Sequence, residues 1–230
     1  PVQITKNSDT YKYSPDWSPD GKKLLWADKK LRLQYVDIDT KKVTLVAQNP
    51  DGELTDYAWS PDSKWIAYSK QELNKQAKIW VFNTETGTTK AITDYWYDCS
   101  SPTFSPDGKY LFFVSNRDFN PTYSNTEWNH AYSDMSRIYF VTLEKSTKNP
   151  LKPEADEVNI ANSGENKEVK PENEKSKDKK GDAKNTVVNV QIDFDGITQR
   201  VVDLPIEAAN YGNLTAARNS LYYIKYKENK

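Results

Sequence analysis

The sequence predicts an all-β protein: a partial β-propeller of about three and a half four-stranded antiparallel blades, an arc of a six- or seven-bladed ring. Two observations predict this fold. One phrase recurs three times at offsets of 42 and 45 residues, and short β-type segments follow each copy. A period of 40–45 residues with four strands per unit is typical of a propeller blade. A closed ring of such units needs roughly 260–300 residues, more than the 230 of this chain.

The recurring phrase predicts a tight turn between two strands. It reads WSPDGKKLLW from Trp17, WSPDSKWIAY from Trp59 and FSPDGKYLFF from Phe104. Proline presets φ at the second turn position, aspartate bonds nearby backbone N–H groups, and glycine accepts a positive φ at little cost. In Ser63, which replaces the glycine once, a positive φ costs roughly 1 kcal/mol. The predicted turn residues are Pro19, Asp20, Gly21, Pro61, Asp62, Pro106, Asp107 and Gly108.

The segments after the first two copies supply the third and fourth strands of their blades. These segments are residues 31–48 and 78–93, each broken by a turn. In the second segment the side chains that point to either face of the predicted strand are apolar: Ile79, Trp80, Val81 and Phe82. A sheet with one wet face would alternate apolar and polar residues. We therefore expect the second blade to lie between two neighbouring blades.

The third repeat is interrupted twice. An aromatic and Asn-rich insertion, residues 115–136, precedes its third strand; it is either an ordered loop that carries function or a loop packed over the blade edge. Further on, residues 165–184 hold 13 charged residues in 20, too little apolar surface to offset the entropy of ordering. The predicted divisions are propeller blades at 1–145, a disordered charged insertion at 146–186, and a continuation of the propeller at 187–230.

The remaining segments extend the blade pattern. Residues 198–204 are the expected last strand of the third blade, residues 210–217 and 220–227 the first half of a fourth, and residues 2–5 the last strand of a preceding one. Strand-like sequence also covers 186–196. Such an arc exposes at least one apolar blade face. We therefore expect further blades on both sides in a parent chain, or a partner that closes the ring.

Composition and motifs exclude several classes of function. The chain has 32 basic and 33 acidic residues, without the cationic excess of a nucleic-acid-binding protein, and no apolar run approaches the ~20 residues of a membrane span. One cysteine, Cys99, and one histidine, His130, are too few for a zinc site. The DFDG sequence at 193–196 lacks the later ligands of a calcium loop. We expect no metal, no cofactor and no nucleic-acid partner.

Catalysis by this chain alone is not expected. A Ser-His-acid triad requires a histidine, and His130 lies in the insertion near Asn129 and Tyr132, where a hydrogen-bonding role in the loop is favoured. The sequence has no Gly-x-Ser-x-Gly elbow to present a nucleophile. It also has no glycine-rich loop for phosphate.

The SPDG-type repeat resembles the propeller repeat of tricorn peptidases, of the periplasmic Tol-system propeller protein and of prolyl oligopeptidase-like enzymes. Residues 115–143, 149–158 and 190–214, and above all the IDFDGI...RVV.LP element, resemble the propeller region of bacterial tricorn-protease homologues. The resemblance covers nearly the whole chain apart from the charged insertion. It implies a parent serine peptidase with a six-bladed and a seven-bladed propeller, a PDZ-like domain and an α/β catalytic core. The 190–214 element favours the seven-bladed propeller.

The resemblance implies a scaffold and a gate for peptides, with the catalytic core elsewhere in the parent chain. The family's catalytic serine and histidine lie in C-terminal domains and match no position here. The implied partners are peptides or unfolded polypeptide and the remaining blades and peptidase domains; a homo-oligomer is compatible with this. The implied compartment is the periplasm or another exported location, with the cytoplasm as the alternative.

Aromatic side chains provide large contact area at low entropic cost, which suits extended peptides. The candidate peptide-binding residues are Tyr95, Trp96, Tyr97, Trp128, His130 and Tyr132. For Tyr95–Tyr97 the alternative is simple packing between blades. Two other functions stay open: a non-enzymatic interaction propeller of the Tol type, and a prolyl oligopeptidase propeller followed by an α/β-hydrolase domain.

Overall fold

The computed structural model describes residues 2–6, 9–118, 121–123, 130–132, 134–152 and 188–227, with the backbone alone at 121–123 and 130–132. The described residues up to Thr147 and from Val188 onward form one compact unit. The predicted disordered insertion, 146–186, falls outside the description except at 146–152, so it stays a prediction. No helix of the described residues is long and apolar enough to cross a membrane.

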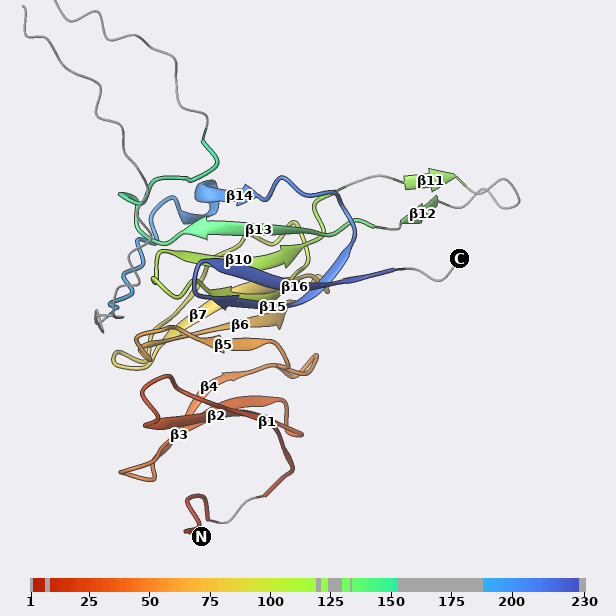
Figure 1. Ribbon diagram of the computed structural model, residues 1–230. Helices are drawn as coiled ribbons and strands as arrows, with labels where there is room; N and C mark the ends of the chain where they lie inside the picture. The colour runs from red at the N-terminus through yellow and green to blue at the C-terminus, as the bar shows by residue number, and fades with distance from the viewer. Residues whose placement is uncertain are drawn as a thin grey trace, which may run out of the picture. The chain divides into compact units, whose positions relative to one another are not determined.

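Three four-stranded antiparallel sheets form the predicted blades (Figure 1). The first contains β1 (Lys12–Trp17), β2 (Lys23–Asp28), β3 (Arg32–Asp37) and β4 (Val43–Gln48), in that order. The second contains β5 (Tyr57–Trp59), β6 (Trp65–Gln71), β7 (Ala77–Asn83) and β8 (Thr89–Ala91). The third contains β9 (Cys99–Phe104), β10 (Tyr110–Ser115), β13 (Arg137–Thr142) and β14 (Val201–Asp203). The all-β, blade-like architecture is therefore confirmed.

Two hairpins and one short helix complete the described elements. The hairpin strands are β11 (Pro121–Tyr123) with β12 (His130–Tyr132), and β15 (Asn210–Ala217) with β16 (Ser220–Tyr226). The 3-10 helix η1 (Ile197–Arg200) precedes β14. In Figure 1, β11 and β12 extend beyond the ends of β10 and β13, and the β15–β16 hairpin lies against the third sheet.

Two strand predictions are wrong. Residues 2–5 form no strand, because a strand exists only through hydrogen bonds to a neighbour and none of the described strands pairs with them. Residues 188–194 also form no strand. Their backbone groups bond to side chains of the second blade instead: the Val190 N–H donates to Asp62 at 2.8 Å, and the Trp65 indole N–H donates to the Val190 carbonyl at 3.1 Å.

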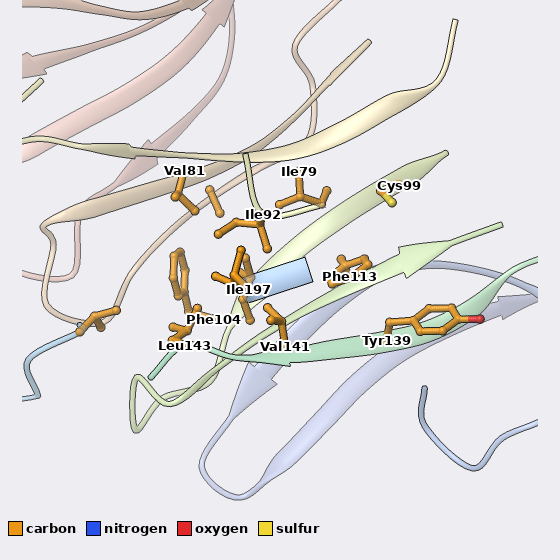
Figure 2. Packing of buried hydrophobic residues seen from close by; sticks show 13 residues of the cluster. Ile79, Val81, Ile92, Cys99, Phe104, Phe113, Tyr139, Val141, Leu143 and Ile197 are labelled. Carbon is orange, nitrogen blue, oxygen red and sulfur yellow. The ribbon is translucent and has the colours of Figure 1, made fainter. Parts of the chain in front are cut away.

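Apolar layers between neighbouring blades form the core. The layer between the first and second blades contains Leu25, Leu33, Tyr35, Trp59, Ile66, Tyr68 and Phe82. The layer between the second and third contains Ile79, Val81, Ile92, Phe104, Leu111, Phe113, Val141 and Ile197. Figure 2 shows Ile79, Val81 and Ile92 on one side of this second layer and Phe113 and Val141 on the other. Because β7 supplies residues to both layers, the prediction that its sheet is covered on both faces is confirmed.

The three repeated turns have the same internal hydrogen bonds. In each, the serine hydroxyl donates to the aspartate two residues later: Ser18 to Asp20 at 2.6 Å, Ser60 to Asp62 at 2.5 Å, and Ser105 to Asp107 at 2.6 Å. Gly21 and Gly108 have φ angles of 69° and 72°, and Ser63 has 62°. The Ser63 hydroxyl accepts the backbone N–H of Asp20 at 3.0 Å. This bond between blades compensates for the strain at Ser63, and a glycine could not make it.

The DFDG sequence is a structural turn. The Lys145 backbone N–H donates to the Asp193 carboxylate at 2.8 Å, and its ammonium group bonds Asp195 at 2.6 Å, which lowers the pKa of Asp195. The Arg200 guanidinium donates to the backbone carbonyls of Leu143 and Asp193. Both carboxylates are thus engaged within the fold. Among the described residues, no three His, Cys, Asp or Glu side chains are grouped so as to hold a metal ion.

Candidate functional site

The loops of the second and third blades lie at two opposite ends of the blades, because successive strands run in opposite directions. In an antiparallel four-stranded blade, the turn from strand two to strand three and the connection to the next blade lie at one end of the strands, while the SPD turns lie at the other end. The first of these ends carries the β6–β7 turn, the segment before β9 and the start of the insertion after β10. We call these loops, residues 72–76, 92–98 and 116–118, the aromatic rim.

The aromatic rim exposes the three neighbouring aromatic residues that the sequence singled out. Tyr95 is 54% exposed, Trp96 68% and Tyr97 40%, so the alternative of packing between blades does not hold for them. The Tyr95 and Trp96 rings stack at 5.0 Å with an interplanar angle of 26°. The Asn74 side chain donates to the Tyr95 carbonyl at 2.9 Å, and the Trp96 N–H donates to Asp94 at 3.1 Å. The exposed rings are therefore held by a defined backbone.

Two cations that sequence reasoning missed accompany these rings. The Lys78 ammonium lies 5.6 Å from the centre of the Tyr95 ring. The Arg117 guanidinium lies 5.1 Å from the Tyr97 ring and 5.0 Å from the Tyr139 ring, within cation–π range. Arg117 lies two residues after β10, at the start of the insertion that the sequence analysis identified as a candidate functional loop. This position is a signal that could have identified it. Lys78 carries no such signal, because only the fold brings β7 beside residue 95.

Hydrogen bonds join the three loops of the aromatic rim at their base. The Asp98 carboxylate accepts the Ala77 N–H at 2.7 Å, and the Asp98 carbonyl accepts the Asn116 N–H at 3.0 Å. The Ser115 hydroxyl accepts the Arg117 Nε–H at 3.1 Å. These bonds connect the second blade to the third and place the Arg117 guanidinium beneath Tyr97.

Tyr139 should make part of the stability of the protein sensitive to alkaline pH. Burial raises the pKa of Tyr139 from 10.0 to about 12, and the charge of Asp118 adds to the effect. Folding therefore favours the neutral phenol. The stability that depends on it is complete below pH 10 and is lost as the pH rises through about 12. The Tyr139→Phe variant should lose less stability over this range, measured by urea unfolding at several pH values. Equal losses in both proteins would contradict the prediction.

The other three predicted binding residues lie in or beside the β11–β12 hairpin. Trp128 is outside the described residues. His130 and Tyr132 are the ends of β12, where their backbones pair with Tyr123 and Pro121. The structure describes only the backbone at these two positions, so their role in binding stays a prediction.

The described residues offer no catalytic arrangement. Cys99 is a buried free cysteine, and burial raises the pKa of its thiol. A reactive cysteine needs an accessible thiolate, so Cys99 is not poised as a nucleophile. The exposed aromatic rings with flanking cations form a surface suited to contact with a ligand rather than to bond cleavage.

The radial sheets and their interlocking apolar layers define the class of this protein as a section of a β-propeller. Residues 1–230 match the family described as the tricorn protease second β-propeller domain. The chain belongs to this family. The resemblance inferred from the SPDG repeats and the IDFDGI element is thereby confirmed, while the number of blades in the ring stays a prediction.

Two similar proteins and one solved structure agree with this assignment. The chain is 29% identical over 209 residues to tricorn protease homolog 1 of Streptomyces coelicolor, covering 91% of this chain and 18% of the relative. It is also 29% identical over 207 residues to the tricorn protease homolog of Saccharolobus solfataricus, covering 90% and 17%. A crystal structure of the tricorn protease matches 94% of this chain with a TM-score of 0.69 and 18% identity, over 19% of that chain. This last match supports the fold, and the chain spans less than a fifth of each of these relatives.

Proposed function

We propose that this propeller section acts as a scaffold and peptide gate in a tricorn-like serine peptidase whose catalytic core lies elsewhere in the parent chain. The partners are peptides or unfolded polypeptide, which meet the aromatic rim on the way to or from that core. The family and the short span of the chain relative to its relatives support a role within a larger protease.

The exposed stack of Tyr95 and Trp96 is the observation that carries this proposal. Large aromatic side chains are costly to leave in water, and two stacked rings offer an apolar platform for peptide side chains. Lys78 lies beside the Tyr95 ring of this platform, and Arg117 lies beside the ring of the neighbouring Tyr97. Both cations can complement peptide carbonyl and carboxylate groups. The site thus suits an extended chain of mixed composition, which is the chemistry of an unfolded peptide.

Removing the platform should weaken peptide binding. The Tyr95→Ala/Trp96→Ala variant should bind a fluorescently labelled, permanently unfolded polypeptide about tenfold more weakly, because each aromatic contact contributes about 0.5–1.5 kcal/mol. Fluorescence anisotropy measures the affinity. The matched control is Tyr222→Ala/Tyr226→Ala, which removes two aromatic rings of comparable exposure from β16. Unchanged affinity in the rim variant, or an equal loss in the control, would contradict the proposal.

The same mixtures also test where the chemistry lies. With the catalytic core elsewhere, the isolated chain should release no fragments from the unfolded polypeptide, as judged by mass spectrometry. Hydrolysis that disappears in His130→Ala would place the catalytic site in this chain and overturn this part of the proposal.

A further inference from the structure

A cavity of about 300 Å³ lies between the third blade and the β15–β16 hairpin, at the end of the strands opposite the aromatic rim. Its lining exposes more apolar than polar surface. Its lining includes Asp107, Tyr110, Ala216, Arg218, Ser220 and Leu221.

The cavity exists because the fourth blade lacks the long turn of the others. In the second blade, the SPDSK turn reaches the preceding blade, where the Ser63 hydroxyl bonds the backbone of Asp20. In the β15–β16 hairpin, Ala217 pairs with Ser220, so only Arg218 and Asn219 form the connection. This shorter turn leaves the space beside the Asp107 turn unfilled.

The equivalent place beside the second blade is occupied by an extended segment of this chain. The Asp62 carboxylate accepts the Val190 N–H at 2.8 Å, and the Trp65 indole donates to the Val190 carbonyl at 3.1 Å. The Lys64 ammonium bonds the Asn189 side chain at 3.4 Å. An SPD turn can therefore hold one residue of an extended peptide by both of its backbone groups and also contact the side chain before it.

The third blade has residues at the positions that bind the extended segment in the second blade. Asp107, Lys109 and Tyr110 stand in the repeat where Asp62, Lys64 and Trp65 stand in the second blade. One Asp107 carboxylate oxygen is held by Ser105, as Asp62 is by Ser60. Among the described residues, the other oxygen meets only the Lys109 ammonium, at 3.6 Å. A carboxylate oxygen that can accept a backbone N–H is thus part of the lining of a mostly apolar cavity.

We propose that this cavity binds an extended segment of a different protein, with a β-branched side chain inside the cavity and the N–H of that residue bonded to Asp107. The seated Val190 is the template for this ligand. Arg218 lines the cavity, and the Lys109 ammonium lies 3.6 Å from the Asp107 carboxylate. These cations favour an aspartate or asparagine just before the β-branched residue, as Asn189 precedes Val190. The site is separate from the aromatic rim, so either proposal can fail without the other.

The probe is a labelled, capped peptide with the sequence Val-Asn-Val-Gln-Ile of residues 188–192. Titrated into the full chain, it should bind with one-to-one stoichiometry and shift the amide NMR signals of Ser220 and Leu221. The same peptide with an N-methyl group on the valine that corresponds to Val190 should bind at least about tenfold more weakly, because a hydrogen bond to a carboxylate is lost.

Two matched protein variants locate the binding. Ala216→Trp fills the cavity and should abolish binding, whereas Ala217→Trp, on the next residue of β15 and outside the cavity lining, should leave it intact. Ser220→Trp is the second filling variant if Ala216→Trp does not fold. The proposal is overturned by absence of binding, by equal binding of the N-methylated peptide, or by equal binding in the filled and control variants. Dimerisation of the chain that Ala216→Trp abolishes would identify a second copy as the occupant and would also overturn it.

Discussion

Phe113→Ala should lower the free energy of unfolding by about 3–5 kcal/mol, because it opens a cavity in the layer between the second and third blades. Phe113 is fully buried and its ring stacks on Tyr139 at 6.2 Å. Figure 2 shows it among side chains from both blades. Neighbouring blades are joined largely through such layers, so the loss is a large share of the roughly 5–15 kcal/mol that stabilises a typical domain.

Urea unfolding followed by circular dichroism measures this loss. The control is Trp96→Ala, which also removes a large aromatic ring but from a position that is 68% exposed. It should change the free energy of unfolding by about 0.5 kcal/mol or less. Equal effects of the two substitutions would mean that the apolar layer between the blades does not hold the fold together.

Gly108→Ala should destabilise the protein much more than Gly21→Ala, although both glycines occupy the same place in the repeat. Both have positive φ, 72° and 69°, so alanine costs about 1 kcal/mol of backbone strain at either position. A methyl group on Gly21 meets nothing within 4 Å. On Gly108 it would lie 2.8 Å from Val190 and 2.9 Å from Val188.

The valines beside Gly108 cannot move aside easily, since β-branched side chains are stiff and Val190 is held by Asp62 and Trp65. The extra cost of crowding is about 1–3 kcal/mol. The two variants should therefore differ by that amount in thermal or urea unfolding. A difference near zero would show that the 188–190 segment does not pack against this turn.

The repeated turns could be predicted almost completely from the sequence. Their conformation depends on proline, aspartate and glycine within a few residues of one another, and such local chemistry is written in one short stretch of chain. The burial of β7 on both faces could also be predicted, because alternate residues of a strand point to opposite faces and those of β7 are apolar on both. The sequence also identifies the aromatic residues 95–97 as binding candidates, with burial between blades as the competing interpretation.

The partners of those residues could not be predicted in the same way. Lys78 and Arg117 come from two different blades. The sequence also predicts a strand over residues 186–196, of which 188–194 form none. That segment is extended and apolar, as a strand is, but its hydrogen bonds go to Asp62 and Trp65, more than a hundred positions earlier. Nothing local in the sequence distinguishes these two outcomes.

By itself, the sequence determined the blades, their turns and the family to which they point, since each rests on residues close together in the chain. Only the tertiary structure decided which segment fills the space beside each SPD turn, where the cations meet the exposed rings, and that one such space is left open. Those features depend on the lengths of distant connections and on which surfaces meet when blades pack. Contacts between repeats depend on how the blades pack, so the sequence of a single repeat does not specify them.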